Sequence, residues 1–569
     1  MNSNDNRNFV LFAVLAVLLL IGWPLVYNRI FPPANPPVTK IEDGKSKPLP
    51  NPNAPAATSA AAVRDRAQVL KESAGQRVRI QTPALTGSIN LKGARIDDLE
   101  LTQYKDTIEK TSPPIRLLSP QGTQDGYFAE FGWQDTGIKV PSPDTVWAAN
   151  SDVLAPGKPV TLSAANGQGQ KFAIEISVDD HYMFTVRQAV ANYGTQPIKA
   201  ASYGLVSRAT PSKDQDTWTI QIGPMSVHNA KADYDVNYKD VDKAASKFTT
   251  TGGWLGFTDK YWLTALVPDQ GSPFAGEFQA NGKGGYQADY SRVASDIAPG
   301  RELIQTSHFF AGAKEVNLLD RYEDKLGIQL FGRAIDWGWF EVIEKPIFKY
   351  LDWLFRNVGN FGVAIMLLTL TIRLLIFPIA QRQFASMAQM RAVQPKMKAI
   401  QEKYKDDKAR QQQEVMALYK SEGVNPLAGC LPTLIQIPIM YSLYKVLMLT
   451  IEMRHQPFVA WIKDLSAPDP LTPINLFGYL DFVPPHWIAI GIFPIVLGVS
   501  MWLQFKMNPA PMDEAQKQVF AIMPWVLMFV MAPFAVGLQL YWITSNLLTV
   551  LQQKILYARH PVLKEAVAK

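Results

Sequence analysis

The sequence predicts an α-helical membrane protein that also carries a large all-β domain. Three features predict this fold class: long apolar runs in the C-terminal third, short alternating strands in the middle, and one apolar run near the N-terminus. The chain has 569 residues, of which 47% are hydrophobic, but that average hides a soluble-looking region from about residue 30 to residue 335. Apolar runs long enough to cross a bilayer dominate the remainder.

The first apolar run covers residues 9–27, which is 19 residues and enough to span a hydrocarbon core. Bulky residues such as Trp23 and Tyr27 end it, whereas a cleaved signal peptide needs small residues at that place. The run therefore favours an uncleaved signal anchor over residues 1–30. Residues 31–75 are rich in proline and alanine, which predicts an extended linker.

The region 76–335 shows short alternating runs broken by Gly, Pro and Asp, with turn signals about every ten residues. This pattern favours an all-β sandwich over a βαβ fold. The region contains no cysteine, since the chain has one, Cys430, so its own core must stabilise it, and it is long enough to have one. Residues 336–357 mix aromatic and charged side chains, which indicates either an amphipathic helix at the membrane interface or a linker helix packed on the β domain.

Five further spans are predicted after the β region, and with the anchor they make six. Their ranges are 358–380, 427–450, 487–505, 519–536 and 538–556. They contain several prolines, which neighbouring helices can accommodate in a bilayer. The helical core therefore extends over residues 358–560.

The distribution of basic residues predicts the orientation, although the net charge of +6 is too mild to indicate nucleic acid as the main partner. Lys and Arg crowd the segment between the second and third spans and recur in the tail, 561–569, whereas the next loop holds two, Arg454 and Lys463. By the positive-inside rule the first segment and both termini are cytoplasmic, and the β domain lies on the other side.

Arg373 lies inside the second span, where a central charge costs about 2.5–3.5 kcal/mol on insertion scales. Its side chain either reaches the cytoplasmic headgroups or faces a water-filled cavity in the bundle. Thr369, four residues earlier, shares its helix face. Further polar residues at membrane depth are Gln436, Gln539, Thr544, Ser545 and Asn546. Each alone is typical of a helix–helix hydrogen bond. Since no acidic residue lies at mid-depth in these spans, Arg373 is expected to attract an anionic or polar group of a guest.

The basic segment 382–424 predicts two helices joined near residues 405–408, a hairpin whose apolar faces pack together. Its charged outer face is suited to ribosomal RNA or anionic lipid, and the contact residues that we expect are Arg391, Lys396, Lys398 and Lys403. We find no phosphate-binding loop, metal-ligand spacing or nucleophile motif in the sequence. The sequence therefore predicts a protein that is not an enzyme and uses no cofactor or metal.

Four stretches of the chain resemble the YidC/Oxa family of membrane protein insertases, in the Gram-negative bacterial form. They are TIRLLIFPIA, QMRAVQPKMKAIQEKY, MALYKSEGVNPLAGCLPTLIQIPIMYSLY and LYWITSNLLTVLQQ. The resemblance extends more loosely to the β domain, where GWLGFTDKYWLTALVP is the clearest piece. It covers the five-span region nearly throughout.

The resemblance implies a positively charged hydrophilic groove among five core helices, with Arg373 as its arginine and Thr369 as its threonine. It implies a galactose-mutarotase-like supersandwich for the β domain. The family's last span often carries two tyrosines where this chain has Tyr541 and Trp542, so the substrate contact of the second aromatic is open here. Implied partners are nascent membrane proteins, the SecYEG and SecDF translocon, the ribosome and the lipid bilayer, with no small-molecule substrate.

From these features we expect an energy-independent insertase and chaperone of the bacterial inner membrane. Its substrate groove comprises Arg373, Thr369, Gln436, Tyr541, Trp542 and Ser545. An alternative is a solute transporter or channel that binds an anion at Arg373, but the internal repeats of transporters are not evident. A membrane-anchored sugar-active enzyme would leave five further spans without a role.

Overall fold

The computed structural model describes residues 39–42, 45–48, 64–134, 136–214, 220–282, 284–405, 407–423, 431–478, 480, 490–507 and 514–559. The predicted N-terminal anchor and the C-terminal tail lie outside these residues. The chain divides into a β-rich unit, Pro37–Gly338 with Leu449–Glu452, and a helical unit that contains the rest.

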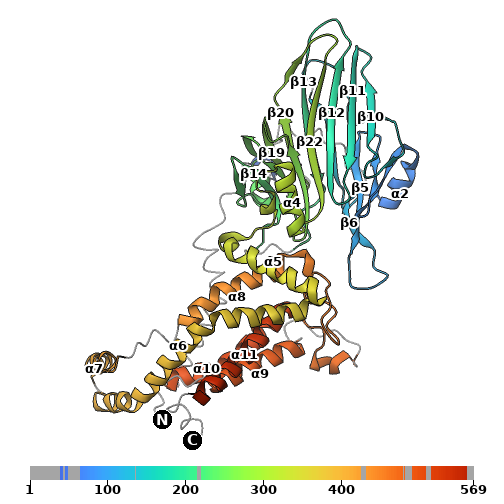
Figure 1. The fold of residues 1–569 in the computed structure, drawn as a ribbon. Helices are drawn as coiled ribbons and strands as arrows, with labels where there is room; N and C mark the ends of the chain where they lie inside the picture. Colours follow the sequence, from blue (N-terminus) through green and yellow to red (C-terminus); the bar gives the residue numbers. More distant parts are fainter. Residues whose placement is uncertain are drawn as a thin grey trace. The chain divides into compact units, whose positions relative to one another are not determined.

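Two large sheets, antiparallel except for one short parallel pair, build the β-rich unit (Figure 1). In spatial order the nine-stranded sheet contains β15 (Lys231–Asp233), β14 (Gly223–His228), β17 (Trp254–Thr258), β18 (Trp262–Pro268), β22 (Glu302–Ala313), β12 (Met183–Asn192), β11 (Gln170–Val178), β10 (Val160–Ala165) and β8 (Ala148–Ala149).

The eleven-stranded sheet contains β16 (Ser246–Thr251), β19 (Pro273–Ala280), β20 (Tyr286–Arg292), β13 (Ile198–Arg208), β7 (Tyr127–Gln134), β5 (Arg95–Lys105), β4 (Leu85–Asn90), β3 (Arg77–Gln81) and β9 (Val153–Leu154), with β6 (Pro114–Leu118) beside β5 and β21 (Ser295–Ile297) beside β13. A separate hairpin, β1 (Thr39–Glu42) and β2 (Lys45–Pro48), lies within the predicted linker.

The core of the β-rich unit lies between the two sheets. Phe131 on β7 packs edge-to-face against Phe309 on β22 with 6.1 Å between ring centroids. Trp133 on β7 meets Phe172 on β11 in the same way at 5.1 Å. Along β11 the buried residues alternate with partly exposed ones, which is the period of a strand with one face in a core. The predicted all-β sandwich is therefore confirmed.

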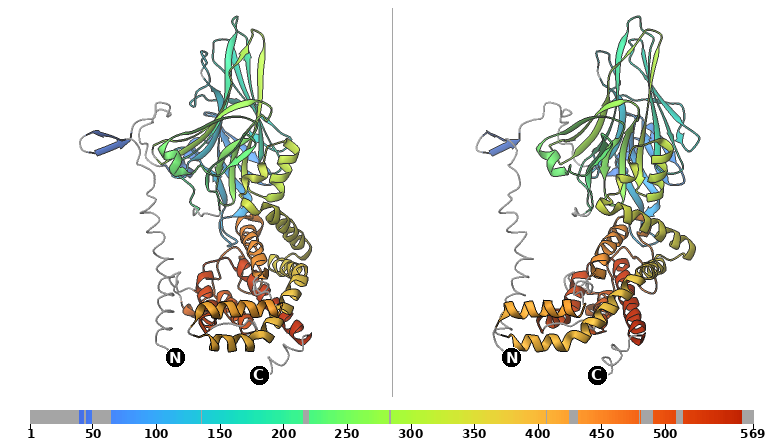
Figure 2. Two further views of the ribbon diagram at one scale, coloured as in Figure 1. Left: turned by 90° about the vertical axis from the view of Figure 1, so that its left-hand side faces the viewer. Right: turned by 60° about the vertical axis from the view of Figure 1, so that its left-hand side comes forward.

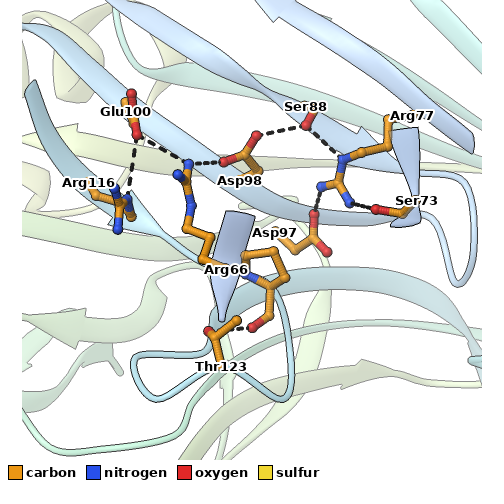
Figure 3. A network of polar contacts seen from close by, with 10 residues as sticks. Arg66, Ser73, Arg77, Ser88, Asp97, Asp98, Glu100, Arg116 and Thr123 are labelled. Carbon is orange, nitrogen blue, oxygen red and sulfur yellow. Dashed lines mark hydrogen bonds and ion pairs between the residues drawn. The ribbon is translucent and has the colours of Figure 1, made fainter. Parts of the chain in front are cut away.

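The β-rich unit also contains three short α-helices, which are α2 (Arg66–Glu72), α3 (Tyr238–Lys243) and α4 (Val316–Leu326). No residue of α2 is buried, and polar contacts fix it to the sheet (Figure 3). The guanidinium of Arg66 contacts Asp98 and lies 3.1 Å from Glu100 Oε1. On β3, Arg77 extends the network to Ser73, Ser88 and Asp97.

Seven helices make up the described part of the helical unit (Figure 2). They are α5 (Glu341–Val358), α6 (Phe361–Lys403), α7 (Lys408–Ser421), α8 (Leu431–Leu449), α9 (Ile492–Met507), α10 (Glu514–Met531) and α11 (Val536–Arg559). Helix α11 packs along both α6 and α9, α10 packs on α9, and α7 lies beside α6.

Helix α5 occupies the position of the predicted amphipathic helix and exposes Trp353 while it buries Phe348 and Leu351. Helix α6 is continuous through the predicted end of the second span, so the first arm of the hairpin is an extension of that span. Within the described residues, Phe361–Gln381 is the segment long and apolar enough to cross a membrane. Helices α8 to α11 lie at the other predicted spans, and the count of six spans stays a prediction.

Candidate functional site

Helix α6 carries Arg373 and Thr369 on one face. The helix begins at Phe361, and the side-chain Oδ1 of the preceding Asn360 caps it by accepting a hydrogen bond from Val363 N at 3.1 Å. Thr369 is 1% exposed and its hydroxyl donates to the Ile365 carbonyl at 2.7 Å. The threonine therefore lies on the buried face of α6, one turn before Arg373. Its hydroxyl donor is used within the helix, and its lone pairs remain as acceptors.

The guanidinium of Arg373 reaches across to α11, where its Nη2 donates a hydrogen bond to the hydroxyl oxygen of Ser545. Ser545 is 3% exposed, so this contact is inside the bundle. Among the described residues no ion pair involves Arg373. Its observed partner is thus a neutral hydroxyl, which does not neutralise the positive charge of the guanidinium.

A second contact joins α8 to α11 close to the first. The side-chain Nε2 of Gln436 lies 2.5 Å from the hydroxyl oxygen of Tyr541, to which it donates. Tyr541 is 1% exposed and precedes Ser545 by one helical turn, so both side chains lie on the same face of α11. We refer to Arg373, Ser545, Tyr541 and Gln436 as the Arg373 cluster.

Trp542, the other aromatic candidate, is half-buried. As the residue after Tyr541 it is rotated by about 100° around the helix axis. Of the two aromatic residues, Tyr541 is the one that makes a hydrogen bond within the Arg373 cluster. The structure thus brings together four of the six predicted groove residues, places Thr369 next to them on α6, and turns Trp542 to an adjacent face.

Another polar contact lies on a different side of α11, toward α9. The amide of Asn546 donates to the hydroxyl oxygen of Ser500 at 3.0 Å, and each residue is 4% exposed. Sequence reasoning identified Asn546 as a polar residue at membrane depth and missed Ser500. A serine in an apolar span was the available signal, but the sequence does not indicate which helix it faces.

The hairpin of α6 and α7 contains the four predicted basic contact residues. The side chain of Arg391 lies outside the described part of the structure. Lys396 forms an ion pair with Glu422, with 2.6 Å from Nζ to Oε1, and is therefore engaged within the hairpin. Lys398 and Lys403 are exposed. The Tyr419 hydroxyl lies 3.1 Å from a methionine sulfur on α6, which supports the predicted packing between the two arms.

The described residues contain no group of three or more His, Cys, Asp or Glu side chains that could hold a metal ion. The polar groups of the Arg373 cluster are a guanidinium, two hydroxyls and an amide. None of these is a general base near neutral pH. What the cluster can do chemically is bind and orient, by donating hydrogen bonds to a carboxylate, carbonyl or hydroxyl.

Two family models match the chain. Residues 77–350 match the YidC periplasmic domain and residues 353–564 match the 60Kd inner membrane protein family. The membrane protein insertase YidC of Zymomonas mobilis is 45% identical, over 99% of this chain and 97% of that protein. The insertase YidC of Methylorubrum extorquens is 44% identical, over 98% of this chain and 96% of that protein.

A solved structure, described as an active YidC insertase crystal structure with the first transmembrane domain resolved, is also similar. It is 20% identical, covers 84% of this chain and 92% of its own, and gives a TM-score of 0.36. The sequence relationships, nearly full-length at 44–45% identity, carry the conclusion. The chain therefore belongs to the YidC family of membrane protein insertases.

Proposed function

We propose that this insertase receives the polar, translocated end of a client membrane protein at the Arg373 cluster. The observation that carries the proposal is the contact between Arg373 and Ser545, which presents a cation whose described partner is a neutral hydroxyl inside the bundle. Ser545 brings no charge to its hydrogen bond with this cation, whereas a carboxylate would accept the same kind of bond and add an opposite charge. The guest's polar end then has a partner at a depth where lipid offers none.

The apolar segment of the client slides along the outside of the bundle, on α8 and α10. Exposed apolar side chains on these helices support this path, and they are Ile437, Trp525, Val526, Phe529 and Val530. Such side chains are as apolar as lipid tails, so a client segment can leave them for the bilayer without a large barrier. Hydrophobic partition and the membrane potential complete the transfer, with no nucleotide consumed.

The family's location implies the bacterial inner membrane, and we extend this to a topology. Residues 1–30 anchor the chain, residues 31–75 link the anchor to a periplasmic β domain, and five spans over 358–560 form the core. Both termini are cytoplasmic, as the basic segments suggest. The exposed Lys398 and Lys403 of the hairpin support a weak contact with the ribosome. SecYEG and SecDF are the translocon partners that we propose for larger clients.

The experiment that tests the proposal is complementation of a strain depleted of its own insertase. Arg373→Ala should reduce the insertion of a short client that needs no translocon by about tenfold, the worth of one charge-assisted hydrogen bond. Arg373→Lys keeps the charge and should retain much of the insertion. Full insertion with Arg373→Ala would exclude the charged groove.

A further inference from the structure

Helix α11 makes polar contacts with three different helices. Ser545 accepts from Arg373 of α6, and Tyr541 accepts from Gln436 of α8. Asn546 donates to a residue of α9. Adjacent residues of a helix point about 100° apart, so Ser545 and Asn546 hold α11 from two different sides. The rotation of α11 about its axis is therefore defined by contacts that lie next to each other in the sequence.

The contact between Asn546 and Ser500 is buried and has a defined direction. The Ser500 hydroxyl donates to the Leu497 carbonyl at 2.8 Å, which leaves its lone pair to accept the Asn546 amide at 3.0 Å. Both residues are 4% exposed. A buried amide that lost this partner would be left with an unsatisfied donor, which costs free energy, so the bond resists rotation of α11.

A small rotation of α11 is enough to disturb the Arg373 cluster. Side-chain atoms lie about 5–6 Å from a helix axis, so a turn of about 20° displaces them by about 2 Å. A displacement of that size takes a hydrogen bond beyond its working distance. The contacts of Ser545 and Tyr541 thus depend on how α11 is held by α9, although Asn546 itself faces away from them.

We propose that Asn546 is a positioning residue of the insertase, which fixes the rotation of α11 through Ser500 and so holds Ser545 and Tyr541 in register with Arg373. Asn546 does not touch the client. Its effect is on the positions of Ser545 and Tyr541 relative to the guanidinium of Arg373. The inference rests on the proposed function, because it assumes that the Arg373 cluster receives the client's polar end.

Three variants of the full-length protein distinguish an effect on the rotation of α11 from a general loss of protein stability. Asn546→Leu removes the hydrogen bond and fills a similar volume, and Ser500 keeps its bond to Leu497. The double variant Asn546→Ser with Ser500→Asn exchanges the two side chains and restores the bond. The control is Gln539→Leu on the same helix. Gln539 is fully buried and donates to the carbonyls of Met531 and Phe534 at 3.0 and 2.9 Å, so the control also loses buried hydrogen bonds, but at the turn between α10 and α11.

The readout is charge selectivity in proteoliposomes without a membrane potential. Two single-span clients are compared that differ by one Asp or Asn in the translocated segment. The native protein should insert the Asp client about tenfold better, because either side chain can accept a hydrogen bond from Arg373 but only the Asp carboxylate adds an opposite charge. Asn546→Leu should lower the ratio of Asp-client to Asn-client insertion to below about threefold, and the double variant that exchanges the two side chains should restore it. Gln539→Leu should reduce the insertion of both clients but leave their ratio unchanged. A native ratio in Asn546→Leu overturns the proposal.

A distance measurement keeps this outcome distinct from a failure of the proposed function. Spin labels at Leu375 of α6 and Leu551 of α11, which are 75% and 53% exposed, report the position of α11 without touching the cluster. Asn546→Leu should change or broaden their separation by about 2 Å, and the exchanged pair should reverse it. If the native protein shows no charge selectivity but the distance changes, the proposed function fails and the positioning of α11 stands. An unchanged distance overturns the positioning role in either case.

Discussion

Arg373 of α6 and Ser545 of α11 are joined by a hydrogen bond inside the bundle, between a cation and a neutral hydroxyl. Ser545 accepts from Nη2, one nitrogen of a guanidinium that has five N–H donors, and does not cancel its charge. A carboxylate at the same place would accept the hydrogen bond and also neutralise the charge. The site would then be a buried ion pair within the protein. In the proposed mechanism, the neutral partner leaves the charge of Arg373 uncancelled for a client's polar end.

Substitution of Ser545 tests this relationship. Ser545→Asp should reduce insertion of a short client about as strongly as Arg373→Ala, because the new carboxylate occupies the guanidinium. Ser545→Ala removes a neutral acceptor and should cost less than about threefold. Insertion is measured by protease protection of the client's translocated end. Equal activity of Ser545→Asp and the native protein would show that the charge of Arg373 has no role.

The contact between Gln436 and Tyr541 predicts a small loss of stability when either polar group is removed. Tyr541→Phe keeps the ring and the packing of a fully buried side chain but removes the hydroxyl that accepts from Gln436. The half-buried amide of Gln436 then lacks its acceptor, which costs about 1 kcal/mol, the typical net contribution of a hydrogen bond, and the thermal stability of the helical unit should fall. The double variant Gln436→Leu with Tyr541→Phe removes both polar groups and should recover part of that loss. A melting temperature that falls further in the double variant would contradict this pairing.

In the β-rich unit, Lys314 makes stability depend on pH. It is 3% exposed with its Nζ 2.9 Å from Thr258 Oγ1, and burial lowers its pKa from 10.5 to about 8. Between about pH 8 and pH 10.5 the unfolded chain keeps a proton that the folded one has released, so the free energy of unfolding rises with pH. The increase has an upper limit of about 3.5 kcal/mol, at about 1.4 kcal/mol for each pKa unit.

The measurement is thermal unfolding of the native protein and of Lys314→Met from pH 7 to pH 10. Other titrating groups are common to both proteins and cancel in the difference. The native protein should gain stability relative to Lys314→Met as pH rises above 8. A difference that is constant over this range would show that Lys314 keeps an ordinary pKa in the folded state.

Helix α2 gives a prediction about local order. Since none of its residues is buried, polar contacts attach it: Arg66 bonds to Asp98 and Glu100, and Arg77 bonds to Ser73 at its C-cap (Figure 3). Arg66→Gln should increase amide hydrogen exchange in α2 by about tenfold or more while β5 keeps its protection. High salt should have a smaller effect in the same direction, because these side chains are partly buried. Unchanged exchange in α2 would mean that other contacts hold it.

Several parts of this structure follow from local sequence patterns. The alternation of buried residues in β11 and the spacing of Thr369 and Arg373 on one helix face both depend on fixed periods of the backbone. Ser545 and Gln436 stand out in the sequence because polar residues are rare in apolar spans. These features need no knowledge of which elements are neighbours in space.

Other parts depend on the packing of whole helices. The partner of Asn546 is on α9, and the choice of Tyr541 rather than Trp542 for the Arg373 cluster depends on the rotation of α11. Neither is encoded within one helix. The continuity of α6 beyond residue 380 was missed because the change from apolar to basic residues marks a change of solvent and not a helix end.

Site-specific photocrosslinking of an arrested client tests the central claim most directly. A photoreactive residue at Trp542, next to the Arg373 cluster, or at Ile437 on the exposed face of α8 should capture a client halted during insertion. The same probe at Val342, 86% exposed on α5, is the control and should capture little of it. With Arg373→Ala, crosslinking at Trp542 should fall by about tenfold while that at Ile437 persists. Equal crosslinking at Trp542 with and without Arg373 would contradict the account.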